Sequence, residues 1–196
     1  MLDKPFSQAC ENNKAVILTE LQRHFAEQTR VLEIGSGTGQ HAVYFAANLT
    51  HLEWHCADQL DYHNGINAWI DDFPSPNLHR PIELNFPGTP WPAILVDAVF
   101  SANTAHIMLE SQAKLMMTSI EQNLPIGGVF CQYGPFTVDG KFSSQSNADF
   151  HAKLIDLGRG GYRDIEELKA WAPLLTLVEI KQMPANNLLL TWHKQA

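Results

Sequence analysis

The sequence has few cysteines and no long apolar run, and each shortage excludes a class of protein. Its three cysteines, Cys10, Cys56 and Cys131, are odd in number and far apart, which argues against a disulfide framework and indicates a reduced, cytoplasmic setting. No apolar run is long enough to cross a membrane. Residues 1–14 are polar and contain no secretory signal. We therefore expect a cytoplasmic protein without a membrane partner.

Basic residues are also scarce. The chain has 13 Lys and Arg against 21 Asp and Glu, which gives a net charge of −8, and it has no run rich in Lys or Arg. Proteins that bind nucleic acid use such runs to neutralise phosphates, so we expect a small-molecule partner and no nucleic acid. With 196 residues, 45% of them hydrophobic, residues 1–196 suit one globular domain, either a monomer or a homodimer.

One glycine-rich stretch, residues 31–41, stands out from this background. Val31, Leu32 and Ile34 are typical of the end of a buried strand. A tight turn with three glycines follows, and residues 40–48 then have the apolar spacing of a helix. Strand, glycine loop and helix in this order form the nucleoside-binding corner of a doubly wound sheet, where a Cβ would block the approach of a ligand. The expected cofactor-binding residues here are Glu33, Gly35, Gly37 and Gly39.

The glycine spacing distinguishes between two classes of ligand. A dinucleotide fingerprint reads G-x-G-x-x-G, and its third glycine position is occupied here by Gln40. The sequence instead reads G-x-G-x-G, with the acidic Glu33 two residues before the first glycine. This combination resembles motif I of the class I S-adenosylmethionine-dependent methyltransferases. The resemblance favours S-adenosylmethionine as the cofactor over NAD.

Further cofactor-binding residues are expected where the next strands end. Residues 52–57 form the second predicted strand, and Asp58 follows it, 19 residues after Gly39. A carboxylate at this place can accept two hydrogen bonds from the ribose hydroxyls, although helix capping is the alternative role for Asp58. Gln59 would then face the adenine. Asn85 and Phe86 follow the third predicted strand, where methyltransferases of this class place an acidic and an apolar residue against the adenine ring.

The remaining elements alternate between strands and helices. We expect a helix over residues 13–26, capped by Asn12 or Asn13, in an N-terminal helical segment that ends at residue 29. Residues 137–165 are polar and contain several glycines, and we expect them to form either a lid or a surface excursion, with a helix at 148–157. Further helices are expected at 66–73, 110–122 and 163–172, and further strands at 81–84, 97–101, 129–133, 176–183 and 188–193.

The acceptor site is expected beyond the fourth and fifth strands, because ligands of open sheets bind at the carboxyl ends of strands. Asn103, His106 and Tyr133 stand there and are the candidate catalytic residues, with Asn103 also near the cofactor. His106 is the obvious base near neutral pH, although a buried histidine bonded to a loop carbonyl is its alternative role. No residue set suggests a metal site. The candidate substrate-binding residues are Asn13, Lys14, Asn186 and Asn187.

Seven stretches spread over nearly the whole chain together resemble one family, the methyltransferase-like proteins long described as a domain of unknown function. The Tyr-Gly-Pro-Phe and Met-Pro-Ala-Asn-Asn stretches are the most specific of them. The resemblance implies the class I methyltransferase fold and S-adenosylmethionine binding, but it implies no substrate. The stretches are 11–14, 33–39, 103–107, 133–136, 146–150, 163–164 and 183–187.

The sequence thus predicts an α/β protein with a doubly wound, seven-stranded sheet that is mostly parallel and has an antiparallel strand in its closing hairpin. The predicted activity is methyl transfer from S-adenosylmethionine to a small polar metabolite, with S-adenosylhomocysteine as the product. A non-enzymatic module that binds either compound is the alternative hypothesis. An NAD-dependent oxidoreductase is disfavoured by Gln40.

Overall fold

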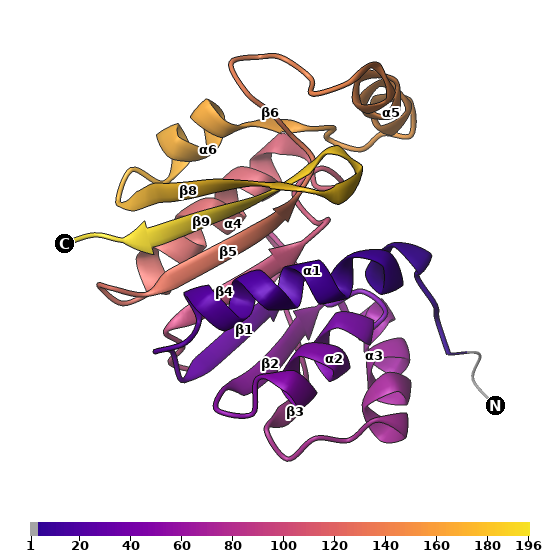
Figure 1. Cartoon of the computed structure of the whole chain (residues 1–196), viewed down its shortest axis with the longest axis vertical. Coiled ribbons are helices and arrows are strands. Elements are labelled where there is room, and N and C mark those ends of the chain that lie inside the picture. The colour runs from indigo at the N-terminus through magenta and orange to yellow at the C-terminus, as the bar shows by residue number, and fades with distance from the viewer. Residues whose placement is uncertain (1–3) are drawn as a thin grey trace. The chain divides into compact units, whose positions relative to one another are not determined.

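The computed structural model describes residues 4–196, which form both strands and helices along the chain (Figure 1). The chain divides into two compact units, the first ending at Ser101 and the second beginning at Ala102. In the first unit β1 runs parallel to both β2 and β4, and β2 runs parallel to β3. Its elements are α1 (Gln8–His24), β1 (Arg30–Ile34), α2 (Gln40–Asn48), β2 (Glu53–Asp58), α3 (Leu60–Asp72), β3 (Leu78–Glu83) and β4 (Ala98–Ala102).

In the second unit β5 pairs with β9, and β9 pairs with β8, both antiparallel. A separate two-stranded parallel sheet joins β6 to β7. The elements are α4 (Glu110–Asn123), β5 (Val129–Gly134), β6 (Phe136–Thr137), α5 (Gln145–Asp156), β7 (Arg163–Asp164), α6 (Ile165–Trp171), β8 (Leu175–Met183), the short 3-10 helix η1 (Pro184–Asn186) and β9 (Asn187–Lys194).

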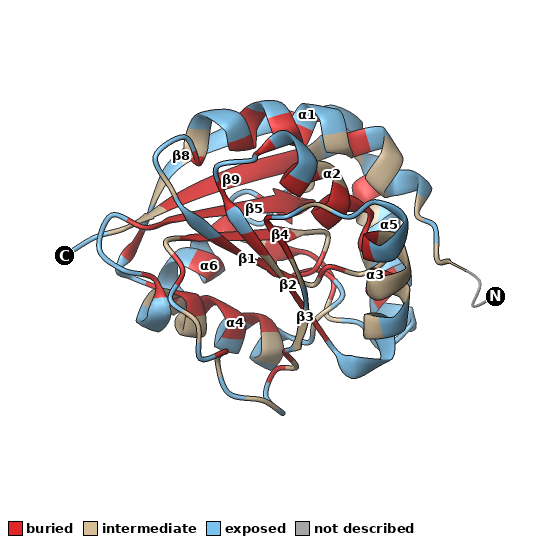
Figure 2. Ribbon diagram, turned by 90° about the horizontal axis from the view of Figure 1, so that it is seen from below, coloured by how far each residue is buried: buried red, intermediate tan, exposed pale blue. Residues whose placement is uncertain are grey.

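The strand order of the main sheet is β3-β2-β1-β4-β5-β9-β8. It confirms the predicted seven-stranded, mostly parallel sheet with an antiparallel closing hairpin. Buried residues, red in Figure 2, run along β1 and β5, as expected for strands covered on both faces. None of the helices formed by residues 4–196 is long and apolar enough to cross a membrane.

An aromatic cluster holds α2 against the strands of the first unit. Phe45 of α2 lies with its ring centroid 5.6 Å from that of Trp54 on β2 and 5.3 Å from that of Phe100 on β4. All three side chains are fully buried, and such pairs contribute beyond the area that they bury. Because α2 follows the glycine loop directly, this cluster fixes the position of that loop.

Several predicted elements were wrong in detail. The helix expected at 66–73 is α3, which begins at Leu60, and the strand expected at 81–84 is β3, which begins at Leu78. The first helix begins at Gln8 and is capped by Ser7, whose hydroxyl accepts from the amide of Cys10 at 3.4 Å, so neither Asn12 nor Asn13 is the cap. The predicted helix at 163–172 begins only at Ile165, because Arg163 and Asp164 form β7, which pairs with β6. The apolar spacing of residues 163–172 does not reveal this pairing, since its partner strand lies far away in the sequence.

Candidate functional site

The glycine loop between β1 and α2 uses left-handed backbone at three positions. Gly35, Gly37 and Gly39 have φ of 77°, 57° and 90°, a region that residues with a Cβ rarely adopt. A Cβ on Gly39 would lie 2.9 Å from Cα of Ile66, so this glycine is needed for the packing of α2 against α3. A Cβ on Gly37 would meet nothing within 4 Å. The backbone at Gly37 therefore leaves room for a ligand, whereas the backbone at Gly39 does not.

Asp58 joins the end of β2 to this loop. Its Oδ2 accepts from the amide of Gly37 at 2.7 Å, and its Oδ1 accepts from the amide of Gln59 at 2.7 Å. Burial raises the pKa of the Asp58 carboxyl, while the two backbone hydrogen bonds act in the opposite direction. Gln59 itself is exposed at the start of α3. The carboxylate thus shapes the loop. The capping alternative is wrong, because the N-cap of α3 is Gln59 and no side chain within residues 4–196 caps this helix. Ribose binding by Asp58 stays a prediction.

Glu33 is a buried acidic residue of β1, just before the glycine loop, with 2% of its surface exposed. Its Oε2 accepts from the indole nitrogen of Trp54 at 3.0 Å and from the hydroxyl of Ser36 at 3.2 Å. Burial raises the pKa of the Glu33 carboxyl to about 7, with a smaller contribution from the charge of Asp58. Glu33 is consequently a group that a neighbouring positive charge would ionise.

The candidates on α1 have partners on α2. Oδ1 of Asn13 lies 2.7 Å from Nε2 of His41, and burial lowers the pKa of His41 to about 4, so this histidine is neutral at pH 7. Nζ of Lys14 lies 2.5 Å from Glu11 and 4.9 Å from the ring centroid of Tyr44. Asn13 and Lys14 thus link two helices, and substrate binding by either residue stays a prediction.

Gln40 supplies a connection that the sequence reasoning missed. Its Oε1 accepts from the amide of Ser7 at 2.5 Å, and its Nε2 donates to Glu11 at 2.8 Å. The side chain that replaces the third glycine of a dinucleotide motif therefore holds the start of α1 against the glycine loop. The sequence signal for this role was the polar side chain of Gln40 itself, which stands where a glycine or an apolar residue is expected.

Asn85 and Phe86 follow β3 in a turn. The amide of Asn85 donates to the hydroxyl of Thr89 at 2.8 Å, and its carbonyl accepts from the amide of Thr89 at 2.8 Å. Phe86 is buried, with 4% of its surface exposed. The turn is therefore fixed by its own backbone, and contact of either side chain with adenine stays a prediction.

In the second unit the structure brings Asn103 and Tyr133 together through the backbone. The amide of Asn103 donates to the carbonyl of Tyr133 at 2.9 Å. Asn103 has a φ of 55°, a left-handed conformation that costs energy for a residue other than glycine. Asparagine adopts this conformation more readily than most residues, and the role of Asn103 in the acceptor site stays a prediction.

His106 is buried, with 8% of its surface exposed, and makes ring contacts only. Its ring centroid lies 6.1 Å from those of Phe150 and Tyr162. Within residues 4–196 no hydrogen bond reaches its ring nitrogens, so the alternative of a histidine bonded to a loop carbonyl is wrong. Burial lowers the pKa of His106 to about 4. It is neutral at pH 7, but it is a weaker base than an ordinary histidine.

The hairpin residues hold the predicted lid. The carbonyl of Asn186 accepts from the side chain of Asn147 at 3.2 Å, and Nδ2 of Asn186 donates to Ser144 at 3.4 Å. Nδ2 of Asn187 donates to the carbonyl of Pro184 at 3.2 Å. Both asparagines therefore have structural partners, and Asn186 joins the hairpin to the start of α5. Their contact with an acceptor stays a prediction.

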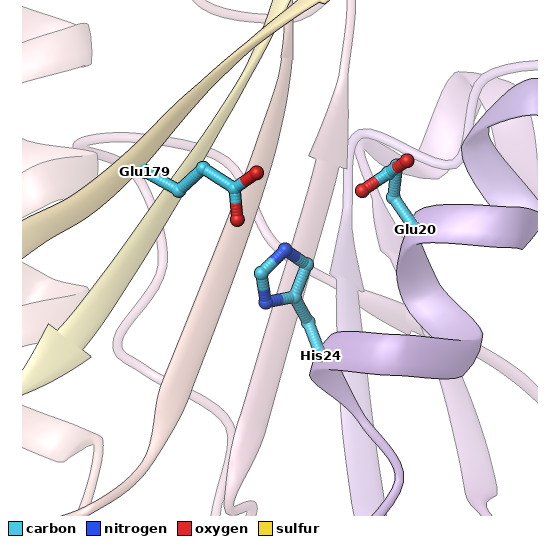
Figure 3. Close-up of side chains that lie close together, drawn as sticks. All are labelled: Glu20, His24 and Glu179. Carbon is cyan, nitrogen blue, oxygen red and sulfur yellow. The ribbon is translucent and has the colours of Figure 1, made fainter.

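Two features of the first unit lie outside the loop. A cavity of about 420 Å³ is lined by Arg30, Glu53, His55, His79 and residues 93–95. Arg30 is the first residue of β1 and Glu53 the first residue of β2. The cavity therefore lies at the amino ends of these strands, whereas ligands of open sheets bind at the carboxyl ends. On α1, His24 lies about one helical turn after Glu20 (Figure 3). The carboxylate of Glu20 accepts from Arg23 at 2.7 Å. Figure 3 also labels Glu179, a residue of β8.

The sequence model of a family described as "Protein of unknown function (DUF938)" matches residues 4–194. Human N-acetylserotonin methyltransferase in complex with SAM has a TM-score of 0.80 at 12% identity, with 96% of this chain and 53% of that chain covered. The S-adenosylmethionine-dependent methyltransferase SibL in its apo form has a TM-score of 0.78 at 17% identity, with 96% and 56% covered. PigF with SAH has a TM-score of 0.76 at 15% identity, with 91% and 54% covered.

This chain spans about half the length of these solved structures. At such low identities the likeness establishes the fold, which is that of the class I methyltransferases. A shared fold does not establish a shared reaction, so the activity has to be argued from the residues.

Proposed function

The chain belongs to the family described as DUF938, proteins of unknown function, and from this premise we propose that it binds S-adenosylmethionine at the glycine loop and methylates a small polar acceptor. The observation that carries the proposal is the pairing of Gly37 with Asp58. Gly37 has free space where a Cβ would stand, and the carboxylate of Asp58 lies 2.7 Å from its amide nitrogen. Open backbone beside a carboxylate suits a ribose, whose two hydroxyls need an acceptor.

The residues around the loop fit the charge of this cofactor. S-adenosylmethionine supplies a methyl group on a positively charged sulfur, and transfer to an oxygen or nitrogen lone pair leaves S-adenosylhomocysteine and releases the acceptor's proton. Glu33, whose pKa burial raises to about 7, gains from a nearby positive charge because ionisation then becomes less costly. Asp58 would hold the ribose, with Gln59, Asn85 and Phe86 on the adenine side.

The second unit would bind the acceptor. Methyl transfer needs an oriented acceptor from which water is excluded, and Asn103, Tyr133 and the buried His106 supply an amide, a phenol and an imidazole. The low pKa of His106 favours hydrogen bonding to the acceptor over strong proton abstraction. The low pKa of His106 also suits a second candidate function, in which the protein binds S-adenosylmethionine or S-adenosylhomocysteine without turnover. A dinucleotide remains disfavoured, because the side chain of Gln40 fills the third glycine position.

The test is calorimetry with S-adenosylmethionine, S-adenosylhomocysteine and NAD. We expect binding of the first two and none of NAD, and we expect Gly37→Val to abolish binding because its side chain enters the ligand's space. Gly127→Val is the matched control, since Gly127 also has a positive φ and nothing within 4 Å of a Cβ, and it should bind normally. Binding of NAD alone, or equal affinities for the two variants, would contradict the proposal.

Enzyme and non-enzymatic binder are then separated by product formation. The protein is incubated with S-adenosylmethionine and a fractionated metabolite extract, and S-adenosylhomocysteine is measured over time. Formation above the rate of the Gly37→Val variant supports the enzyme. Tight binding with no product in any fraction supports the binder.

A further inference from the structure

Arg163, the first residue of β7, carries a buried positive charge that the proposed function has not used. Only 6% of its surface is exposed. Its Nε donates to the carbonyl of Gly161 at 3.3 Å, and its Nη2 donates to the carbonyl of Gly160. These are neutral acceptors. The remaining N–H groups of the guanidinium donate to no other residue among 4–196.

No carboxylate within residues 4–196 pairs with this guanidinium. The neighbouring Asp164 accepts from the hydroxyl of Thr137 and the amide of Gly140, both at 2.8 Å, and from the amide of Glu166 at 3.0 Å. Its oxygens are committed to the cap of α6 and the turn after β6. A buried cation without a counter-ion is costly, so the unpaired charge indicates a site that an anion completes.

The guanidinium is not sealed inside the protein. Arg163 contributes no atom to the fully buried side-chain nitrogens and oxygens that have no hydrogen-bond partner. Nη1, which has no partner among residues 4–196, is therefore not fully buried, and solvent or a ligand can reach it. A guanidinium is planar and can present parallel N–H donors to the two oxygens of a carboxylate.

Arg163 also lies beside the segment that carries His106. A Cβ placed on Gly160 would lie 2.8 Å from Nη2 of Arg163 and would overlap the carbonyl oxygen of Met108, two residues after His106. Tyr162, the residue before Arg163, has its ring against His106. In the register of the small sheet, Arg163 is paired with Phe136, two residues after β5 ends.

We propose that Arg163 binds a carboxylate of the methyl acceptor and so selects monocarboxylic acids as substrates. This inference rests on the proposed function for the identity of the ligand as an acceptor. The single positive charge of one guanidinium matches the one negative charge of a carboxylate better than the two of a phosphate. The carboxylate serves as the anchor and another group is methylated, because hydrogen bonds from a guanidinium make the anchored oxygens poorer nucleophiles.

The experiment titrates the full chain with benzoate, benzamide and inorganic phosphate, without cofactor, and follows binding by ligand-observed NMR. We expect benzoate to bind and benzamide, its neutral analogue, to bind at least tenfold more weakly. Arg163→Met should weaken benzoate binding at least tenfold. Arg159→Met is the control, because Arg159 is an exposed arginine in the loop that leads to β7, and it should leave benzoate binding unchanged.

A melting experiment checks that the Arg163 variants are folded at the temperature of the titration. Arg163→Met loses the hydrogen bonds to the carbonyls of Gly160 and Gly161, so it should lower Tm more than Arg159→Met does, and benzoate binding is compared well below both melting temperatures. If Arg163→Met does not fold, Arg163→Lys keeps the charge but loses the planar fork, and it should still weaken benzoate binding. Benzoate affinity unchanged by the substitution, no benzoate binding at all, or tighter binding of phosphate than of benzoate would each overturn the proposal.

The outcome is independent of the cofactor test. Benzoate binding that depends on Arg163, in a chain that fails to bind S-adenosylmethionine, would uphold the anion site and remove the methyltransferase. Binding of S-adenosylmethionine without any effect of Arg163 on benzoate would uphold the proposed function and remove the carboxylate.

Discussion

The glycine loop of the first unit and the segment around His106 and Arg163 in the second unit use their buried polar groups in opposite ways. In the first, Asp58 accepts two amides and His41 meets Asn13, so each group has a partner within the protein. In the second, His106 makes ring contacts only, and Arg163 donates to two carbonyls without a counter-ion. In the first region these buried polar groups are bonded within the protein, whereas in the second region His106 and Arg163 retain a capacity for hydrogen bonding to a ligand.

The largest expected effect is a loss of stability, and it should differ between two glycines of the same loop. Gly39→Ala should lower the free energy of unfolding by about 2–4 kcal/mol, because its Cβ would lie 2.9 Å from Cα of Ile66 on a backbone with a φ of 90°. Gly37→Ala, which meets no atom within 4 Å, should cost clearly less. Urea unfolding of both variants measures the difference. Equal losses would mean that the whole loop, and not only Gly39, is packed.

Removal of the Asp58 carboxylate should weaken cofactor binding by the first region. Asp58→Ala should weaken S-adenosylmethionine by roughly tenfold to a hundredfold, since a charged hydrogen bond contributes about 1.5–3 kcal/mol. Calorimetry measures the change, and circular dichroism checks that the fold persists. Asp61→Ala, at an exposed position in the first turn of α3, is the control. An unchanged affinity would assign Asp58 to loop structure alone.

Two buried histidines allow a direct comparison of the regions at pH 7.5. His41→Phe leaves Oδ1 of Asn13 without its partner and should lower the free energy of unfolding by about 1–2 kcal/mol. His106→Phe removes no hydrogen bond and should change it by less than about 0.5 kcal/mol. Denaturant unfolding of the two variants tests this. A larger loss for His106→Phe would show that the second region is as tightly paired as the first.

The smallest expected effect is the change in the stability of the His106→Phe variant, relative to the natural chain, at acidic pH. The folded pKa of His106 is lowered to about 4, below the value near 6.5 of an unfolded chain. The stability that depends on a neutral His106 is therefore present above pH 6.5 and is lost as the pH falls towards 4. At pH 5.5 the His106→Phe variant should be more stable than the natural chain by about 1 kcal/mol. Unfolding measured at pH 7.5 and 5.5 checks the sign, and a variant that is equally sensitive to acid would contradict it.

Local patterns predicted much of the fold. The helix at 40–48 was placed at its observed bounds, and the strand order and closing hairpin agree with the doubly wound sheet. Apolar periodicity and glycine spacing are properties of neighbouring residues, so they can be read directly. The start of α1 at Gln8 and the strand at Arg163 were missed. Both depend on partners far along the chain, namely Gln40 for the residue that caps α1 and Phe136 for the strand.

The sequence by itself determined the fold class and the position of the glycine loop, because buried strands and left-handed turns impose residue types that local chemistry dictates. Only the tertiary structure decided which polar groups are satisfied. It bonded Asn13 to His41, anchored α1 through Gln40, and left the guanidinium of Arg163 buried without an acidic partner among residues 4–196. Whether a charge is paired depends on which distant segments meet around it, and no local pattern in the sequence records that.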